Sequence, residues 1–375
     1  MAVSTSRIIE NYNPNAPLAE ASTPPASWYR NPRLLQIERD TVFFHSWQVV
    51  GRTGQLRDPG RFITCDIAGE PILIVRGKDG VLRGFYNVCR HHAAAILIQP
   101  EGTVQNLRCP YHGWTYDLAG RLVLAPEFAG VAKFDRSANG LVPVQLAVWQ
   151  GWVFVNLADG QPPLERYLGS DLLERFERLN LERLRWFERR SYKLNCNWKV
   201  FVDNYLDGGY HVPHIHGGLN SVLDYSNYTV ESGERFCLQT SPVSTDKGDA
   251  KTAAVRTGSR ACYYWIYPNF MINIYDGIMD TNLVIPRGVD QTEVVFDYYF
   301  ADVSNQARKR NLASIAVSEQ IQAEDVAICE SVQRGLNSRA YSTGRLSVRR
   351  ESGEHLFHRL LHADLITGLH PEPER

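Results

Sequence analysis

Two short stretches in the first half of the chain each combine a cysteine with a histidine. Cys89 and His91 lie in CRHH, Cys109 and His112 lie in CPYH, and 17 residues separate His91 from Cys109. Such ligands hold either tetrahedral zinc or a Rieske [2Fe–2S] cluster, in which cysteines bind one iron and histidines the other. Zinc fingers usually pair like with like, whereas each stretch here mixes both types. The spacing therefore favours a Rieske cluster, and His92, beside His91, is assigned no ligand role.

A second group of possible metal ligands follows in DNYLDGGYHVPHIH, residues 203–216. Two histidines and one carboxylate form the facial triad of non-haem Fe(II) oxygenases, which leaves positions open for O₂ and substrate. Such a histidine cluster alone fits a structural role or a zinc site equally well. Because a Rieske cluster supplies electrons one at a time, its presence upstream favours Fe(II).

With these motifs in place, the chain resembles the α-subunits of Rieske non-haem iron oxygenases from Trp47 to its last helix, and among them choline monooxygenase-like proteins. The matching strings are NWKVFVDNYLDGGYHVPHIH, YPNFMINIY and EDVAICESVQRGL. The resemblance implies a [2Fe–2S] cluster, a mononuclear Fe(II), O₂ as co-substrate and a homotrimer. It also implies the α+β fold class, with an antiparallel β Rieske domain followed by a helix-grip catalytic domain.

The resemblance assigns the iron ligands residue by residue. It implies His211 and His216, which are separated by four residues, and Asp325 from a long C-terminal helix. His214 falls off the pattern and is expected to have a structural or supporting role. Nothing in the local sequence alone would single out Asp325, because acidic residues on such a helix ordinarily face solvent.

The family also places a carboxylate before the first histidine ligand, where it bridges to the cluster of a neighbouring subunit. Many members have this acid three residues before the histidine, at the position of Gly208 in this sequence. Asp207, four residues before, is the predicted bridge, and Asp203 is the alternative. Asn204 is a candidate residue near the iron, or else a capping or buried hydrogen-bonding side chain.

The substrate that the resemblance implies is choline, hydroxylated to betaine aldehyde hydrate. A quaternary ammonium has no N–H to donate, so proteins hold it against aromatic faces. In the sequence CYYWIY, Tyr263, Trp265 and Tyr267 would share one face of a strand, and Phe270 and Tyr275 are further candidates. Packing in the core of a sheet is the favoured interpretation of these aromatic residues.

Other functions stay open on the sequence. The same chemistry would serve an aromatic-ring hydroxylase or an N-demethylase of betaine- or carnitine-like amines. A Rieske electron carrier or redox sensor without oxygenase activity is a third possibility. The chain shows no glycine motif for a flavin or NAD, so a ferredoxin or a flavin-containing reductase is the expected electron donor.

Composition restricts the partners. Forty Lys and Arg stand against 41 Asp and Glu, a net charge of −1 that offers no basic excess for nucleic acid. No apolar run approaches the roughly 18 residues of a membrane span. Seven cysteines, thinly spread in a chain without an apparent export signal, argue against a disulfide framework. We therefore expect a cytoplasmic protein that binds neither nucleic acid nor membrane.

Periodicity indicates which elements position these residues. Three domains are predicted: an arm and helix that pack on the catalytic domain (1–46), the Rieske domain (47–157) and the catalytic domain (164–375). Short strands are expected at WQVVGR, FITCDI, PILIVR, VLRGFYNV, LVPVQLAVW and WVFVNL. Beyond them we expect helices at 31–46, 171–190, 303–336 and 353–366, strands at 261–268, 270–286 and 291–300, and a lid or mobile insertion at 217–260.

Overall fold

The computed structural model describes residues 5–244 and 248–369. The chain forms two compact units. The first, here called the N-terminal sheet unit, is Arg39–Tyr167, and the second, the C-terminal sheet unit, combines Met1–Glu38 with Leu168–Arg375. Both are built on antiparallel sheets, and helices accompany the sheet of the second, so the predicted α+β class is confirmed.

The N-terminal sheet unit contains all six strands that the alternating apolar residues predict. Its main sheet has the order β1-β10-β9-β4-β3-β2-β5, and a small sheet has the order β6-β7-β8. The four shortest strands escaped prediction, because two or three residues are too few to show a period of two. The bounds are β1 Gln48–Arg52, β2 Arg61–Ile67, β3 Glu70–Arg76, β4 Leu82–Tyr86, β5 Glu101–Thr103, β6 Leu107–Arg108, β7 Thr115–Tyr116, β8 Leu122–Leu124, β9 Pro143–Trp149 and β10 Trp152–Asn156.

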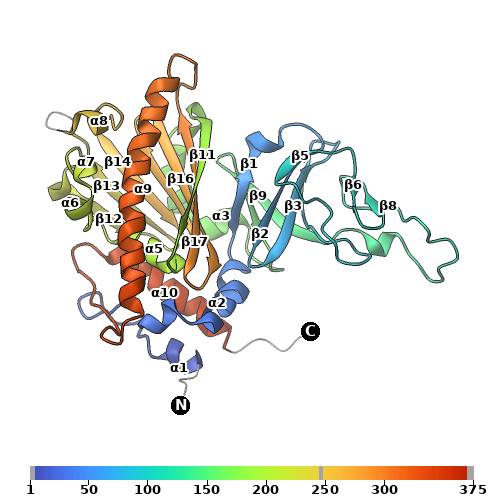
Figure 1. Ribbon diagram of the computed structural model, residues 1–375, viewed down its shortest axis with the longest axis horizontal. Helices are drawn as coiled ribbons and strands as arrows, with labels where there is room; N and C mark the ends of the chain where they lie inside the picture. The colour runs from blue at the N-terminus through green and yellow to red at the C-terminus, as the bar shows by residue number, and fades with distance from the viewer. Residues whose placement is uncertain (1–4, 245–247, 370–375) are drawn as a thin grey trace. The chain divides into compact units, whose positions relative to one another are not determined.

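The C-terminal sheet unit is a seven-stranded antiparallel sheet in the order β11-β17-β16-β15-β14-β13-β12. The long helix α9, Arg308–Leu336, crosses one face of this sheet (Figure 1). This is the helix-grip arrangement that we expected. The strands are β11 Arg185–Leu194, β12 Thr229–Ser232, β13 Phe236–Pro242, β14 Arg260–Ile266, β15 Phe270–Tyr275, β16 Ile278–Gly288 and β17 Gln291–Phe300.

Short helices fill the connections in both units. No helix in the described ranges, α9 included, is both long and apolar enough to cross a lipid bilayer. The α-helices besides α9 are α1 Thr5–Glu10, α2 Pro32–Glu38, α3 Leu164–Leu168, α4 Ser170–Glu177, α5 Trp198–Leu206, α6 Val212–Ile215, α7 Gly217–Asn220, α8 Ala250–Ala253 and α10 Ser352–Thr367. A π-helix, η2, covers Arg39–Phe43, and 3₁₀ helices are η1 Ala26–Tyr29, η3 Thr53–Leu56, η4 Ser137–Asn139, η5 Leu181–Arg183 and η6 Tyr225–Asn227.

Residues 5–38 pack against the C-terminal helices of the same unit. The indole of Trp28 stacks on the ring of His362, with centroids 6.3 Å apart. The carboxylate of Glu38 forms a fully buried ion pair with Lys199 at the start of α5. Within this arm, α1 and η1 form two short helical segments.

Three predicted elements were wrong. The single strand predicted over 270–286 is two strands, β15 and β16, joined by a tight turn. The helix predicted over 171–190 ends at Glu177, and Arg185–Leu194 is the edge strand β11. Asn180 adopts the left-handed conformation, with φ 49°, and so separates the two elements. The segment 217–260 is not simply a lid, because β12 and β13 in it belong to the sheet; its residues 245–247 lie outside the described residues.

Candidate active site

The two cysteine–histidine stretches fold into loops of the same shape, Cys89–Ala94 and Cys109–Trp114. In each loop the cysteine N–H donates to the carbonyl five residues on, and the N–H four residues on donates back to the cysteine carbonyl. The residue at this fourth position is left-handed in both, with φ 58° for Ala93 and 73° for Gly113. Two matched turns therefore each present one cysteine and one histidine.

The side chains of these loops fit a [2Fe–2S] cluster. The rings of His91 and His112 have centroids 4.7 Å apart, and Cys89 and Cys109 are both buried free thiols. Nδ1 of His91 is buried and has no hydrogen-bond partner among the described residues. A buried polar nitrogen without a partner is costly, and coordination to iron would satisfy it. Trp114 stacks on the same imidazole at 4.9 Å and holds its orientation.

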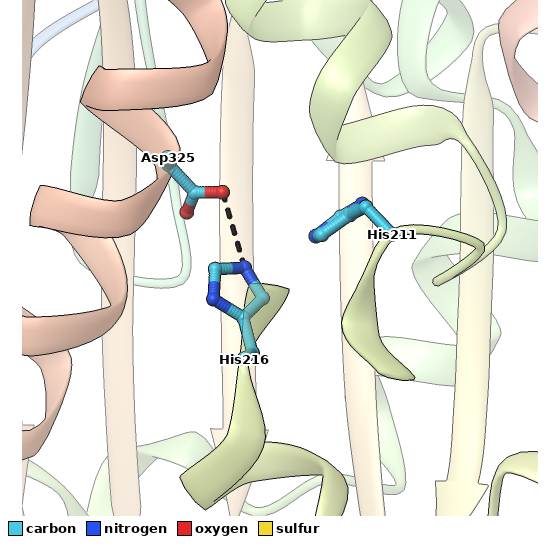
Figure 2. A group of neighbouring side chains, drawn as sticks. All are labelled: His211, His216 and Asp325. Carbon is cyan, nitrogen blue, oxygen red and sulfur yellow. Dashed lines mark hydrogen bonds and ion pairs between the residues drawn. The ribbon is translucent and has the colours of Figure 1, made fainter. Parts of the chain in front are cut away.

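The second group gathers three side chains from segments that are far apart in the sequence. Figure 2 shows Asp325 projecting from α9 toward His216, with His211 beside them. One ligand atom from each of the three lies within 4.8 Å of the others, and His216 Nε2 is 3.1 Å from Asp325 Oδ1. His211 and His216 lie at the two ends of the short helix α6. Two imidazoles and one carboxylate in this arrangement can hold a mononuclear iron.

Carboxylates engage the outer nitrogens of both histidines. His211 Nδ1 lies 2.7 Å from Asp207 Oδ2, and His216 Nδ1 lies 2.7 Å from Glu324 Oε2. A proton held on Nδ1 leaves the Nε2 lone pair of each ring free for a metal. Asn204 donates to Asp325 Oδ1 at 2.8 Å and so orients the third candidate ligand.

Glu324 is a site residue that the sequence did not reveal. Neighbouring residues on a helix point about 100° apart, which would exclude Glu324 as a second ligand to the same metal. The two carboxylates instead contact opposite nitrogens of one imidazole, that of His216. The Glu-Asp pair on α9 was the available signal. His214, between the two histidines, is exposed and does not join the group.

The two aspartates proposed for the bridge lie in different places. Asp207 contacts His211, whereas Asp203 accepts from Tyr29 OH at 2.7 Å and lies 2.9 Å from His358 Nε2. Gly208, between Asp207 and His211, is left-handed with φ 69°, as is the glycine after it. This double glycine turn accommodates the additional residue between the acid and the histidine, so the carboxylate still reaches the ring from four residues away.

A cavity beside His211, His216 and Asp325 has an empty volume of about 780 Å³, including space that is open to solvent. Tyr205, Tyr228, Tyr263 and Tyr275 are among its lining residues. Their hydroxyls are occupied by protein groups: Tyr205 donates to Asn273 at 2.8 Å, Tyr228 donates to Gln239 at 3.0 Å, and the hydroxyls of Tyr263 and Tyr275 lie 2.6 Å apart. The hydroxyls are thus held by hydrogen bonds within the protein, and the four tyrosines give the cavity an aromatic wall.

The predicted aromatic face of β14 is only partly in this cavity. Tyr263 lines it together with Tyr275, but Trp265 and Tyr267 do not. Trp265 packs on Phe357 of α10 with centroids 5.6 Å apart, and Tyr267 donates to Asp364 of the same helix. Phe270 is buried outside the lining. Tyr263 and Tyr275 therefore line the cavity, whereas the other predicted aromatic residues pack in the core. Tyr205 and Tyr228 were missed because they come from other elements.

Comparisons with known proteins identify the two domains that contain these residues. Residues 46–135 match the family model of the Rieske [2Fe–2S] domain, and residues 181–365 match that of the ring hydroxylating alpha subunit (catalytic domain). These domains confirm the predicted cofactors, which are a [2Fe–2S] cluster and a mononuclear iron that uses O₂.

The similarity to individual proteins extends over nearly the whole chain. Chloroplastic choline monooxygenase of Arabidopsis thaliana is 40% identical over 96% of this chain and 87% of its own. The carnitine monooxygenase oxygenase subunit of Escherichia coli K12 is 32% identical over 86% of each. The crystal structure of a quaternary ammonium Rieske monooxygenase with L-carnitine superposes with TM-score 0.81 at 30% identity, covering 95% of this chain and 98% of that one. The chain belongs to the Rieske non-haem iron oxygenases, among the α-subunits that include the choline and carnitine monooxygenases.

Proposed function

We propose that this oxygenase hydroxylates a small quaternary ammonium substrate, with choline as the leading case. The observation that carries the proposal is the wall of four tyrosine rings in the cavity beside the candidate iron ligands. Aromatic faces attract a cation that cannot form hydrogen bonds, and the attraction strengthens when water is excluded. The relatives named above act on choline or carnitine, which share this head group.

The proposed reaction converts choline, O₂, two electrons and two protons into betaine aldehyde hydrate and water. Cys89, His91, Cys109 and His112 would hold the cluster, and His211, His216 and Asp325 would hold the iron, which supplies O₂ activation when bound. Asp207 retains a proton on Nδ1 of His211, and Glu324 does the same for His216. Asn204 fixes the rotamer of Asp325. The tyrosine wall positions the hydroxyl-bearing carbon of the substrate toward these ligands.

An aromatic-ring hydroxylase would require an apolar cavity without buried charge. Asp280 and Arg256 both line this cavity and both are buried, at 4% and 2% exposure. The cavity therefore favours a charged substrate over a hydrocarbon. The alternative of an electron carrier without oxygenase activity is set aside, because the relatives are monooxygenases.

Electrons reach a Rieske oxygenase from a separate redox protein, and we propose a ferredoxin or a flavin-containing reductase here. We also propose a homotrimer in which Asp207 connects the iron of one subunit with the cluster of the next. Mixed trimers of His91→Ala and His211→Ala subunits would test this: recovered activity supports transfer between subunits, and its absence supports transfer within one chain. The predicted cytoplasmic location stays a prediction, since the plant relatives are chloroplastic.

The substrate is tested by reducing the loaded enzyme without oxygen and then adding O₂ with a panel of amines. We expect betaine aldehyde hydrate from choline, coupled to the electrons consumed. Preferential oxidation of glycine betaine or carnitine, with loss of a methyl group as formaldehyde, would move the assignment to an N-demethylase. If no methylammonium compound gave a coupled product, the substrate class would be wrong.

A further inference from the structure

Asp280 is a buried carboxyl group in the cavity wall, on the interior strand β16. It lies directly across from Asn273 on β15 and is 4% exposed. Asn273 and Asn282 donate to its Oδ1 at 2.8 and 3.0 Å. Among the described residues no hydrogen bond reaches its other oxygen and no Lys, Arg or His approaches within ion-pair distance. A buried carboxylate is normally paired, because removing an ionised group from water is costly.

Arg256, the nearest positive group of the cavity wall, has other partners. Its Nη1 and Nη2 donate to Ser314 and Ser318 of α9 at 2.8 and 2.6 Å, and its guanidinium carbon lies 4.9 Å above the ring of Tyr275. Arg256 lowers the pKa of Asp280 only in part, since burial raises it by more. The cavity wall thus contains a carboxyl group that no positively charged side chain of the described residues pairs with.

We propose that Asp280 supplies the counter-charge for the cationic head group of the substrate and so makes a permanent positive charge a requirement for binding. The tyrosine wall attracts the same head group through its ring faces but also accepts an uncharged group of equal shape. The ring faces favour the cation over a neutral tert-butyl group, and a carboxylate beside them adds a full negative charge to that preference. This inference rests on the proposed function and adds the residue that selects the charge of the substrate.

A purely structural role for Asp280 makes a different prediction. If the carboxylate served only to join Asn273 and Asn282, its loss would disturb the sheet and weaken every ligand alike. The variant Asp280→Asn keeps the shape and a carbonyl acceptor for both amides but removes the charge. If Asp280 recognises charge, Asp280→Asn should lower the affinity for cationic ligands more than the affinity for neutral ones.

The experiment compares choline with 3,3-dimethylbutan-1-ol, which replaces the charged nitrogen by carbon. Calorimetry would measure binding, and kcat/KM of the loaded enzyme would measure turnover. In Asp280→Asn we expect choline to lose about 30-fold in both, while the neutral alcohol changes by less than about threefold. Asp276→Asn is the matched control, because Asp276 is exposed in the turn between β15 and β16 and should leave both ligands unaffected.

The outcomes separate this inference from the proposed function. If Asp280→Asn bound choline as tightly as the unaltered enzyme, or lost both ligands equally, the inference would be wrong even if choline were oxidised. If the unaltered enzyme bound choline through Asp280 but oxidised no methylammonium compound, the proposed function would fail and the inference would stand.

Discussion

At the scale of single residues, the candidate iron site depends on which nitrogen of each histidine carries a proton. Asp207 and Glu324 come from different elements, yet each lies 2.7 Å from an Nδ1. A carboxylate at this position fixes the tautomer and makes the opposite nitrogen a better metal ligand. The two acids are thus as much a part of the site as the atoms that would contact iron.

Glu324→Gln should weaken mononuclear iron binding by about 10- to 100-fold and leave the cluster intact. The neutral amide is a weaker hydrogen-bond acceptor than the carboxylate for the proton on His216 Nδ1, so Nε2 becomes a poorer metal ligand. Iron per chain after dialysis, set against the visible absorption of the cluster, measures this. Glu319→Gln on the same helix is the control, since Glu319 pairs with Arg190 outside the site. Unchanged iron retention in Glu324→Gln would remove Glu324 from the site.

Asp207→Asn should keep both metals but slow turnover by about 100-fold, because the proton on His211 Nδ1 loses its acceptor and the proposed bridge loses its charge. Electron transfer from the cluster to the mononuclear iron is measured as the rate at which O₂ oxidises the reduced cluster in the presence of substrate. Asp203→Asn provides the comparison, as Asp203 contacts Tyr29 and His358 instead. A normal rate in Asp207→Asn with a slow rate in Asp203→Asn would reverse the two roles.

The sequence revealed these residues unequally. The mixed spacing of Cys89, His91, Cys109 and His112 was sufficient to indicate a cluster without any relative. Asp325 was found only through resemblance, because no local pattern separates it from the surface acids of α9. Glu324 was missed altogether, since its role depends on how one imidazole lies between two helical side chains, which is a property of tertiary packing.

At the scale of elements, the turn between α5 and α6 sets the distance from Asp207 to His211. Its first glycine, Gly208, has φ 69°, and a Cβ there would lie 2.2 Å from the carbonyl oxygen of Arg350. Neither the backbone angle nor the space admits a side chain. The family pattern with an acid three residues before the histidine is therefore replaced here by a longer turn that only glycine can make.

Gly208→Ala should displace this turn, lower iron content and reduce activity by at least about tenfold, with a loss of stability of about 1–3 kcal/mol. Iron analysis and thermal unfolding would measure both effects. Gly217→Ala is the control, because a Cβ at Gly217 meets nothing within 4 Å. A fully active Gly208→Ala enzyme would show that the turn can relax without moving Asp207 or His211.

The elements themselves were predictable where the apolar pattern was long. The strands of five or more residues in the N-terminal sheet unit, α9 and α10 all appear close to their expected positions. The failure at 171–190 has a physical cause: in β11 the charged side chains lie along an exposed edge, where spaced Glu and Arg imitate a helical surface. Antiparallel pairing with β17, not local propensity, decides the structure of this segment.

At the scale of the whole molecule, one half-buried acid makes stability depend on pH. Burial raises the pKa of Asp364 from 3.8 to about 6, although Tyr267 donates to it. Between about pH 4 and pH 6 the unfolded chain therefore releases this proton while the folded chain retains it. The contribution of Asp364 to stability is complete below that window and falls as the pH rises through it.

Near pH 4, Asp364→Asn should consequently have the same free energy of unfolding as the original protein. At pH 7 its free energy of unfolding should be higher by about 2 kcal/mol, allowing for partial exposure of the side chain. Urea unfolding followed by circular dichroism across this range tests the difference. Asp290→Asn serves as the control, because Asp290 is exposed in the turn after β16. A constant difference at every pH would show that Asp364 does not retain its proton in the folded state.

The division of the chain into units has a consequence for its biosynthesis. Residues 39–167 form a continuous unit and can close their sheet as soon as they leave the ribosome. Residues 5–38 are made earlier, but their partners, such as His362 for Trp28, are among the last residues synthesised. The surface of the arm that contacts α10 must therefore wait for this partner through nearly the whole of translation. Its docking on α10 closes a loop of more than 300 residues, and that late step completes the C-terminal sheet unit.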